Sequence, residues 1–270
     1  MKLYRYLTDR KLEWLLEDEG IHQSPLSNWE SQDNPEGLST FVDELKADGG
    51  LIVLDVAFNV ALPSIKPKTK EERQQLRDLD RELATHKYSV LGKHFFSQES
   101  NLMSTLEKMR GHIYMSSWTK GVQNETVMWE RFGYDNAANS FNSVRIETSL
   151  DRLDKELVVP KGITVIPDHV SYRDYDTDIT DWNGSEINPY FSKPKVYKGD
   201  TTNFAEEDEF RLVSFKDDFD LEDTPADYMK FKVDLGRLIK KIEVSPKADV
   251  TYRDEVEEKL KSLNLKHLLK

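Results

Sequence analysis

The stretch "NFAEEDEFRLVSF", Asn203–Phe215, combines the alternation of a β-strand with an unusual set of charges. Successive side chains of a strand point to opposite faces, so Glu207, Glu209 and Arg211 are predicted to share one face while Phe210 lies on the other. Two carboxylates on one face repel each other unless a cation or a substrate lies between them. The stretch is therefore either an edge strand protected by charge or part of a functional site.

A second strand is predicted near the N-terminus, in "LYRYLT". There Leu3, Arg5 and Leu7 share a face, which places a cation between apolar neighbours. Such an arginine needs an anionic partner. The alternatives are an ordinary salt bridge and a side chain whose charged end reaches solvent.

A third strand is predicted in "HIYMSSW", where two adjacent serines lie between Tyr114 and Trp118. Serine is a poor strand former, so Ser116 and Ser117 indicate a place where the strand spares room or offers hydrogen bonds. A strand that ends in a turn explains the same pattern.

The order of the predicted elements indicates an α+β architecture, and we expect a single domain over residues 1–270. "DRKLEWLLEDEG" is predicted as a helix that stops at Gly20, and "STFVDELKADGG" as another that leads into an apolar strand from Leu51. "TKEERQQLRDLDRELATHKYSVLGK" is predicted as one long charged helix, opened by a capping box of Thr69 and Glu72, and "SQESNLMSTLEKMRGH" as a further helix. The second half is predicted to be extended in "SVRIET", "GITVIPDHVSYRDY", "EFRLVSF" and "YMKFKVDLGRLIKKIEVS", before a closing helix in "RDEVEEKLKSLNLKHLLK".

Composition excludes several classes of protein. The chain has 270 residues, no cysteine, and a net charge of −12 from 38 basic and 50 acidic residues. Zinc sites built on sulfur and disulfide frameworks are excluded, and we expect a cytoplasmic protein without a membrane segment. The acidic charge disfavours nonspecific binding to nucleic acid, although a local basic cluster such as Lys193, Lys195 and Lys198 could line one edge of a cleft.

The common catalytic signatures are missing. No glycine-rich dinucleotide or P-loop motif, no GxSxG and no HExxH is present. "DYDTDITDWNGSE" imitates the first half of a calcium loop, but its sixth position is Ile179 and its twelfth is Ser185, so a solvated acidic loop is predicted and no metal is expected.

Together the three strands resemble the ADP-ribosyltransferases of the arginine, serine, glutamate type. "YMSSW" is similar to their Tyr-hydrophobic-Ser-Thr-Ser strand, with Trp118 in place of the third serine, and "EDE" is similar to their Glu-x-Glu. The resemblance implies a split β-sandwich flanked by helices and a reaction with NAD that needs no metal.

The whole chain also resembles a bacterial family known as domain of unknown function 2971. The similarity is carried by "LYRY", "SPLSNWESQDNPEG", "SSWTKGVQNETVMWERFG" and "LIKKIEVSPKADVTYRDEVEEKL". Phe132 occupies a position where that family usually has tyrosine. This resemblance brings no established chemistry.

The transferase resemblance implies a role for each candidate residue. Glu209 would stabilise the positive charge that develops on the ribose, Glu207 would orient or deprotonate the acceptor, and Arg211 would hold the carboxylates by an ion pair. The residues expected to bind NAD are Arg5 on the pyrophosphate, Ser116 and Ser117 near the nicotinamide ribose, where Ser116 also supports the glutamate, and Tyr6, Tyr114 and Trp129 as stacking partners.

Two other functions stay open. One is a non-catalytic sensor or scaffold of a defence system that shares the fold. The other is a metal-dependent nuclease using Asp33, Glu36, Glu207 and Glu209. If the transferase prediction holds, the resemblance implies a bacterial toxin or antiphage effector with a macromolecular acceptor, protein or nucleic acid, and a neutralising antitoxin partner.

Overall fold

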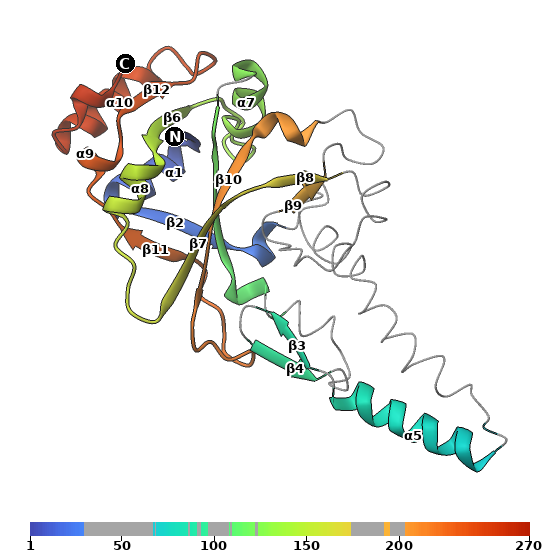
Figure 1. Ribbon diagram of the computed structural model, residues 1–270. Helices are drawn as coiled ribbons and strands as arrows, with labels where there is room; N and C mark the ends of the chain where they lie inside the picture. The colour runs from blue at the N-terminus through green and yellow to red at the C-terminus, as the bar shows by residue number, and fades with distance from the viewer. Residues whose placement is uncertain are drawn as a thin grey trace.

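The computed structural model describes residues 1–29, 67, 69–85, 87–90, 93–96, 108, 110–121, 124–173, 192–194 and 203–270 (Figure 1). Within this part, the chain folds as a mixed α/β protein around one antiparallel sheet of eight strands. The helix predicted over "STFVDELKADGG", the strand from Leu51 and the calcium-like loop all lie outside the described residues.

The eight strands come from the N-terminal, middle and C-terminal parts of the chain. Six lie in the order β11-β2-β5-β1-β6-β12, and β10 and β7 extend the sheet from β5. The strands are β1 (Lys2–Thr8), β2 (Gly20–Pro25), β5 (Tyr114–Thr119), β6 (Ser143–Ser149), β7 (Ile163–His169), β10 (Glu209–Lys216), β11 (Met229–Lys232) and β12 (Lys241–Val244). Two small separate sheets pair β3 (Lys87–Val90) with β4 (Lys93–Phe96), and β8 (Ser171–Arg173) with β9 (Ser192–Pro194).

The described helices are mostly short. They are α1 (Asp9–Glu17), α5 (Lys70–Thr85), α7 (Glu125–Phe132), α8 (Leu150–Glu156), α9 (Leu235–Leu238) and α10 (Tyr252–Ser262), with single 3-10 turns at Leu26–Trp29, Phe204–Glu207 and Lys266–Leu268. No helix among the described residues is long and apolar enough to cross a membrane.

Local sequence signals set several of these boundaries. The predicted capping box is confirmed, because the Thr69 hydroxyl accepts from the Glu72 N–H at 3.1 Å and the Glu72 carboxylate accepts from the Thr69 N–H at 3.1 Å. The helix ends at Thr85, however, and β3 follows it, so the prediction of one helix as far as Lys93 was wrong. Lys87–Val90 contains aromatic and β-branched residues, which favour a strand.

Two other boundaries differ from the predictions. Helix α1 ends at Glu17, earlier than the predicted stop at Gly20. Glu19 takes a left-handed conformation with φ of 45°, and Gly20 already begins β2. The stretch predicted to be extended up to the C-terminal helix is interrupted by α9, because the Asp234 side chain accepts from the Arg237 N–H and caps a helical turn.

The central feature of the sheet is a split beside β5. Strand β5 pairs along its whole length with β10, from Glu209↔Thr119 to Ser214↔Tyr114. The opposite edge of β5 is shared: β2 pairs only at Tyr114 and Met115, and β1 only at Thr119. Strand β1 leaves β5 to pair with β6 over all seven of its residues. Ser116, Ser117 and Trp118 therefore have no strand partner on that edge within the described sheet.

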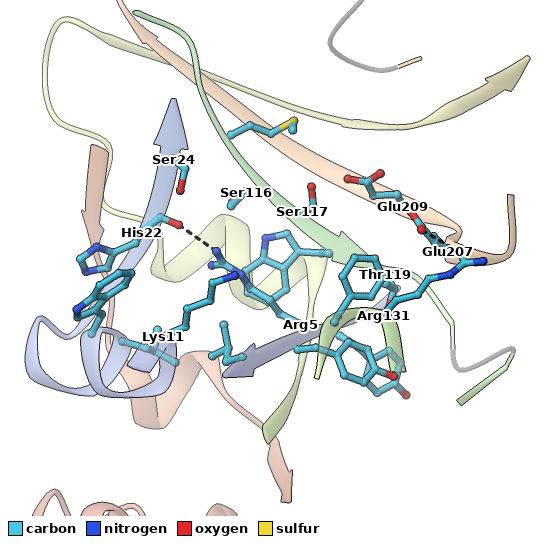
Figure 2. Close-up of a pocket in the computed structure, with 18 of the residues that line it drawn as sticks. Arg5, Lys11, His22, Ser24, Ser116, Ser117, Thr119, Arg131, Glu207 and Glu209 are labelled. Carbon is cyan, nitrogen blue, oxygen red and sulfur yellow. Dashed lines mark hydrogen bonds and ion pairs between the residues drawn. The ribbon is translucent and has the colours of Figure 1, made fainter. Parts of the chain in front are cut away.

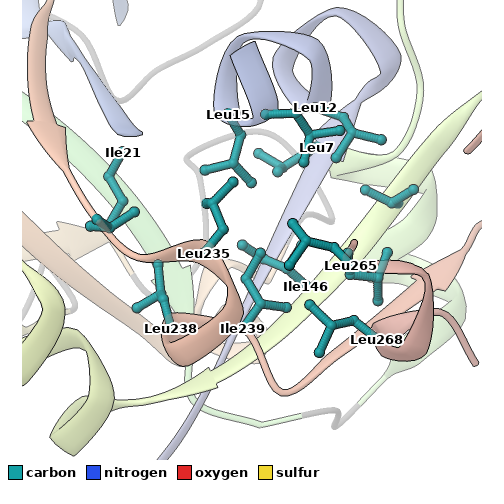
Figure 3. Packing of buried hydrophobic residues seen from close by; sticks show 14 of the residues in the cluster. Leu7, Leu12, Leu15, Ile21, Ile146, Leu235, Leu238, Ile239, Leu265 and Leu268 are labelled. Carbon is teal, nitrogen blue, oxygen red and sulfur yellow. The ribbon is translucent and has the colours of Figure 1, made fainter. Parts of the chain in front are cut away.

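A large apolar core covers one face of the sheet and holds these strands in place (Figure 3). Helix α1 buries Leu12, Leu15 and Leu16 at helical spacing, and α10 buries Tyr252, Val256 and Leu260 in the same way. They pack with apolar side chains of β1, β6, α9 and the C-terminal turn, including Leu3, Leu7, Ile146, Leu235, Leu238 and Leu268. Of the three residues predicted to share a face of β1, Leu3 and Leu7 enter this core and Arg5 lies between them.

We expect Val256→Ala to lower the free energy of unfolding by roughly 1.5 kcal/mol, because two buried methyl groups of about 0.8 kcal/mol each and the cavity left behind outweigh a small gain in helix propensity. Val256 is fully buried, whereas Val250 is 97% exposed. Urea unfolding of Val250→Ala, the matched control, should show a change within about 0.5 kcal/mol. Equal effects of the two substitutions would contradict this packing.

Candidate functional site

A cavity of ≈ 460 Å³ opens at the split in the sheet (Figure 2). This volume falls within the range of about 300–1,000 Å³ that is typical of small-molecule sites. The polar residues that line it are Tyr4, Arg5, Tyr6, Lys11, Trp14, His22, Ser24, Asn28, Ser116, Ser117, Trp118, Thr119, Arg131, Glu207 and Glu209. Three strands distant in sequence, β1, β5 and β10, thus contribute to one cavity.

The lining comes from both faces of the sheet. Residues that pair across strands share a face, and neighbours along a strand alternate. By the register, Thr119 and Glu209 lie on one face, while Ser116 and Trp118 lie on the other. The cavity reaches both sets because β1 and β2 separate from β5 at this point.

Arg5 lies in the cavity wall without a carboxylate partner among the described residues. Its guanidinium donates to the backbone carbonyl of His22 at 3.0 Å and lies 5.4 Å from the centre of the Trp118 ring. Burial lowers the pKa of Arg5 to about 10, and no anion among the described residues offsets that burial. A buried guanidinium left in this state has donors available for an anionic ligand.

Three neighbouring polar groups on β5 are also unpaired. The hydroxyls of Ser116 and Ser117 and the indole N–H of Trp118 are buried and have no hydrogen-bond partner among the described residues. Ser116 and Trp118 are each 1% exposed. Leaving a buried donor unsatisfied costs about 1–3 kcal/mol, so these groups indicate a place where a polar ligand supplies the missing bonds.

At the acidic end of the cavity, arginine side chains donate hydrogen bonds to the glutamates. Glu209 begins β10, and Arg211 donates two hydrogen bonds to it, from Nε at 2.8 Å and from a terminal nitrogen at 2.9 Å. Both side chains are about 95% buried. The Glu209 N–H donates to the Tyr172 hydroxyl at 2.8 Å, and its carbonyl accepts from Val170 at 3.0 Å. The carboxylate is therefore fixed in position by its own strand.

Burial raises the pKa of Tyr172 and the nearby Glu209 charge raises it further, so the phenol stays protonated. Its oxygen accepts from the backbone, which leaves the phenol O–H to point elsewhere.

Glu207 does not lie on the strand, and the prediction that it shares a face with Glu209 and Arg211 as part of one strand was wrong. It ends the 3-10 turn Phe204–Glu207, and Asp208 then takes a left-handed conformation with φ of 42°. Because the chain changes direction at Asp208, Glu207 and Glu209 do not follow one another on a single strand. Both side chains still line the cavity. Glu207 is 3% exposed and pairs with Arg131 of α7 at 3.0 Å.

The other predicted residues divide into two groups. Tyr6 and Ser117 line the cavity, but Tyr114 and Trp129 do not. Tyr114 donates its hydroxyl to the Ala226 carbonyl at 3.0 Å, and Trp129 packs edge-on against Tyr6 at 4.8 Å in a small cluster with Met128. Both are core side chains, so they have no face left for a nicotinamide or adenine ring.

The two serines lie on faces of the sheet that differ from the prediction. Ser116 was predicted to support the glutamate, but Ser117 is the residue that pairs with Arg211 in the register and so shares the face of Glu209. Because strand side chains alternate, Ser116 lies on the face of Trp118 instead.

Several cavity residues were not predicted from the sequence, among them Lys11, Trp14, His22 and Arg131. Lys11 and Trp14 are three residues apart on α1, a spacing that brings side chains together on one helix face. That spacing predicts that the two side chains lie together on one face of the helix. It could not predict that this face lies beside Arg5, which only the structure shows. His22 pairs with Asp18 at 2.8 Å, and burial lowers its pKa.

Several other predictions cannot be compared with the structure. Asp33 and Glu36, proposed for a nuclease, lie outside the described residues, as do Lys195 and Lys198, and of Lys193 only the backbone, in β9, is described. Across the described ranges, no group of three or more His, Asp or Glu side chains could hold a metal ion.

We expect Arg211→Met to lower the free energy of unfolding by about 3 kcal/mol, because it removes two hydrogen bonds from a buried carboxylate. In a double-mutant cycle with Glu209→Gln, the coupling energy should be at least about 1 kcal/mol. Lys120→Met is the control, since its pair with Asp208 at 2.6 Å is partly exposed and should contribute less than about 1 kcal/mol. Additive effects of Arg211→Met and Glu209→Gln in urea unfolding would contradict a tight pair.

Comparisons of the chain with protein-family models, curated proteins and solved structures find no match. The resemblances to the domain of unknown function 2971 family and to the ADP-ribosyltransferases thus remain predictions from short motifs. Function must be inferred from the cavity itself.

Proposed function

We propose that the protein is an NAD-dependent ADP-ribosyltransferase with the split sheet of that class as its scaffold. One observation carries the proposal: Arg5, Ser116 and Glu209, from three strands far apart in sequence, line the same cavity. The sequence motif requires these three residues to converge on one cleft. By the register, Arg5 and Ser116 lie on one face of the sheet and Glu209 on the other, so the proposal depends on the cavity joining the two faces beside β5.

The two ends of the cavity match the two ends of the reaction. Arg5 and the unpaired donors of β5 offer hydrogen bonds to the phosphates and ribose of NAD. The acidic end lies where the nicotinamide ribose would be held. Departure of nicotinamide develops positive charge on that ribose, and a fixed carboxylate stabilises it.

In the proposed reaction, the bond between the ribose C1′ and the nicotinamide nitrogen breaks, and its electron pair leaves with neutral nicotinamide. The acceptor nucleophile then forms a bond to C1′ and releases its proton to solvent. Glu209 faces the developing charge, with its orientation set by the two bonds from Arg211. Glu207 orients the acceptor, a role that its ion pair with Arg131 favours over proton abstraction.

A non-catalytic sensor remains the alternative, since the same unpaired donors support binding without turnover. A metal-dependent nuclease fits less well. Each of its two described carboxylates, Glu207 and Glu209, is already hydrogen-bonded by an arginine. A metal would have to compete with those guanidinium groups for the same oxygens.

We expect the purified protein to release nicotinamide from NAD when lysate protein, RNA and DNA are offered as acceptors. Glu209→Gln should slow release by at least about 100-fold, because the charge that stabilises the transition state is lost. Arg5→Ala should raise KM for NAD more than it lowers kcat. Glu206→Gln, which makes the same change on the 3-10 turn that precedes β10 but does not line the cavity, should retain wild-type activity. Absence of release with all acceptors, or full activity of Glu209→Gln, would refute the transferase.

We further propose that the protein acts in the cytoplasm as a toxin or antiphage effector, neutralised by a protein partner, and modifies a macromolecule. Expression in a bacterium should then arrest growth, and Glu209→Gln should relieve the arrest while matched immunoblots show equal protein levels. Harmless overexpression of a protein that cleaves NAD in vitro would contradict this role.

A further inference from the structure

Helix α1 adds a second cation to the cavity. Lys11 lines it together with Arg5, and Figure 2 shows the Lys11 side chain extending toward the Arg5 guanidinium. The two positive charges repel each other, and the surrounding protein atoms and Arg5 lower the pKa of Lys11. Placing two cations side by side is unfavourable unless an anion joins them.

Among the described residues, Lys11 forms no salt bridge, although the Asp135 carboxylate is near enough to act on its pKa and the chain is rich in acids. The protein carries 50 acidic residues against 38 basic ones. Other lysines in the same part of the fold are paired: Lys230 with Asp18 at 2.8 Å, and Lys259 with Asp9 at 2.8 Å. Within the described residues, Arg5 and Lys11 therefore have no direct ion pair, and Asp135 compensates the Lys11 charge only in part, because the pKa of Lys11 stays lowered.

The neutral donors beside this cation pair point to an anion with several oxygens. Ser116 and Trp118 are nearly fully buried, line the same cavity, and have unpaired polar atoms. Two cations and two neutral donors match the oxygen atoms of linked phosphates better than a single carboxylate.

An exposed aromatic side chain lies at the mouth of the cavity. Trp14 is three residues after Lys11 on α1 and is 40% exposed, which is unusual for an indole. Its ring is nearly parallel to that of His22, with centroids 6.0 Å apart. The exposed Arg10 side chain lies 4.8 Å from the indole centroid. Exposed aromatic rings beside phosphate-binding groups are suited to stack on nucleobases.

We propose that Arg5, Lys11 and Trp14 form a subsite for a nucleoside diphosphate, in which the two cations bind the phosphates and the indole contacts the base. The assignment rests on the proposed function in taking the cavity as the substrate site. It adds that the adenosine half of the substrate leaves the cavity past α1, and that recognition depends on a diphosphate rather than a single phosphate.

Binding of ADP, AMP and inorganic pyrophosphate to the purified protein, measured by titration calorimetry, tests the subsite. We expect Lys11→Met to weaken ADP binding about tenfold or more and AMP binding less, because a charge-assisted bond to the second phosphate is lost. Trp14→Ala should weaken ADP and AMP but leave pyrophosphate unchanged. Methionine is a good helix former, so α1 should be retained. Lys161→Met, at an exposed turn outside the cavity, is the charge-matched control and should bind as wild type.

Wild-type ADP affinity in Lys11→Met, or no binding of ADP by the wild-type protein, would overturn the subsite. The nicotinamide assay separates this failure from failure of the transferase. If ADP binds in a Lys11-dependent way but no nicotinamide is released, the subsite stands and the transferase fails. If NAD is cleaved with the same KM in Lys11→Met as in wild type, the transferase stands and the subsite fails.

Discussion

The incomplete pairing of β5 is the constraint on which the rest of the site depends. Strand β1 pairs with β6 over its full length but pairs with β5 only at Thr119. Strand β2 pairs with the other end of β5. Ser116, Ser117 and Trp118 line the opening between them from regular strand positions. Side chains on a strand are held more precisely than side chains on a loop, which suits a site that must align several groups.

The electrostatic arrangement follows from the same split. The carboxylate end lies where β10 begins, and each glutamate there is bonded to an arginine, Glu207 to Arg131 and Glu209 to Arg211. The cationic end lies where β1 approaches α1, and Arg5 and Lys11 face the cavity without such partners in the described structure. Within the described cavity, Glu207 and Glu209 are thus compensated while Arg5 and Lys11 form no salt bridge, and this polarity favours a ligand with a negative and a neutral or positive end.

Strands and amphipathic helices could be predicted from the sequence because their periodic patterns are local. "LYRYLT" and "EFRLVSF" alternate clearly, and the capping box at Thr69 marks a helix start. The convergence of Arg5, Ser116 and Glu209 was predicted only through a resemblance, since no local pattern encodes which strands diverge. Glu207 was misplaced because a single left-handed residue, Asp208, interrupts the alternation. Tyr114 and Trp129 were overvalued because an aromatic side chain in the core and one in a binding site have the same local pattern.

The hydrogen bond from Arg5 to the His22 carbonyl has a consequence for the cost of binding. Strands β1 and β2 do not pair with each other, and this bond is a direct polar link between them across the split. A guanidinium has five N–H donors, so Arg5 can keep its bond to β2 while it receives an anion. The charged group that meets the ligand is thus already fixed in place before the ligand arrives. Binding then requires little ordering of the protein, and more of the interaction free energy is retained as affinity.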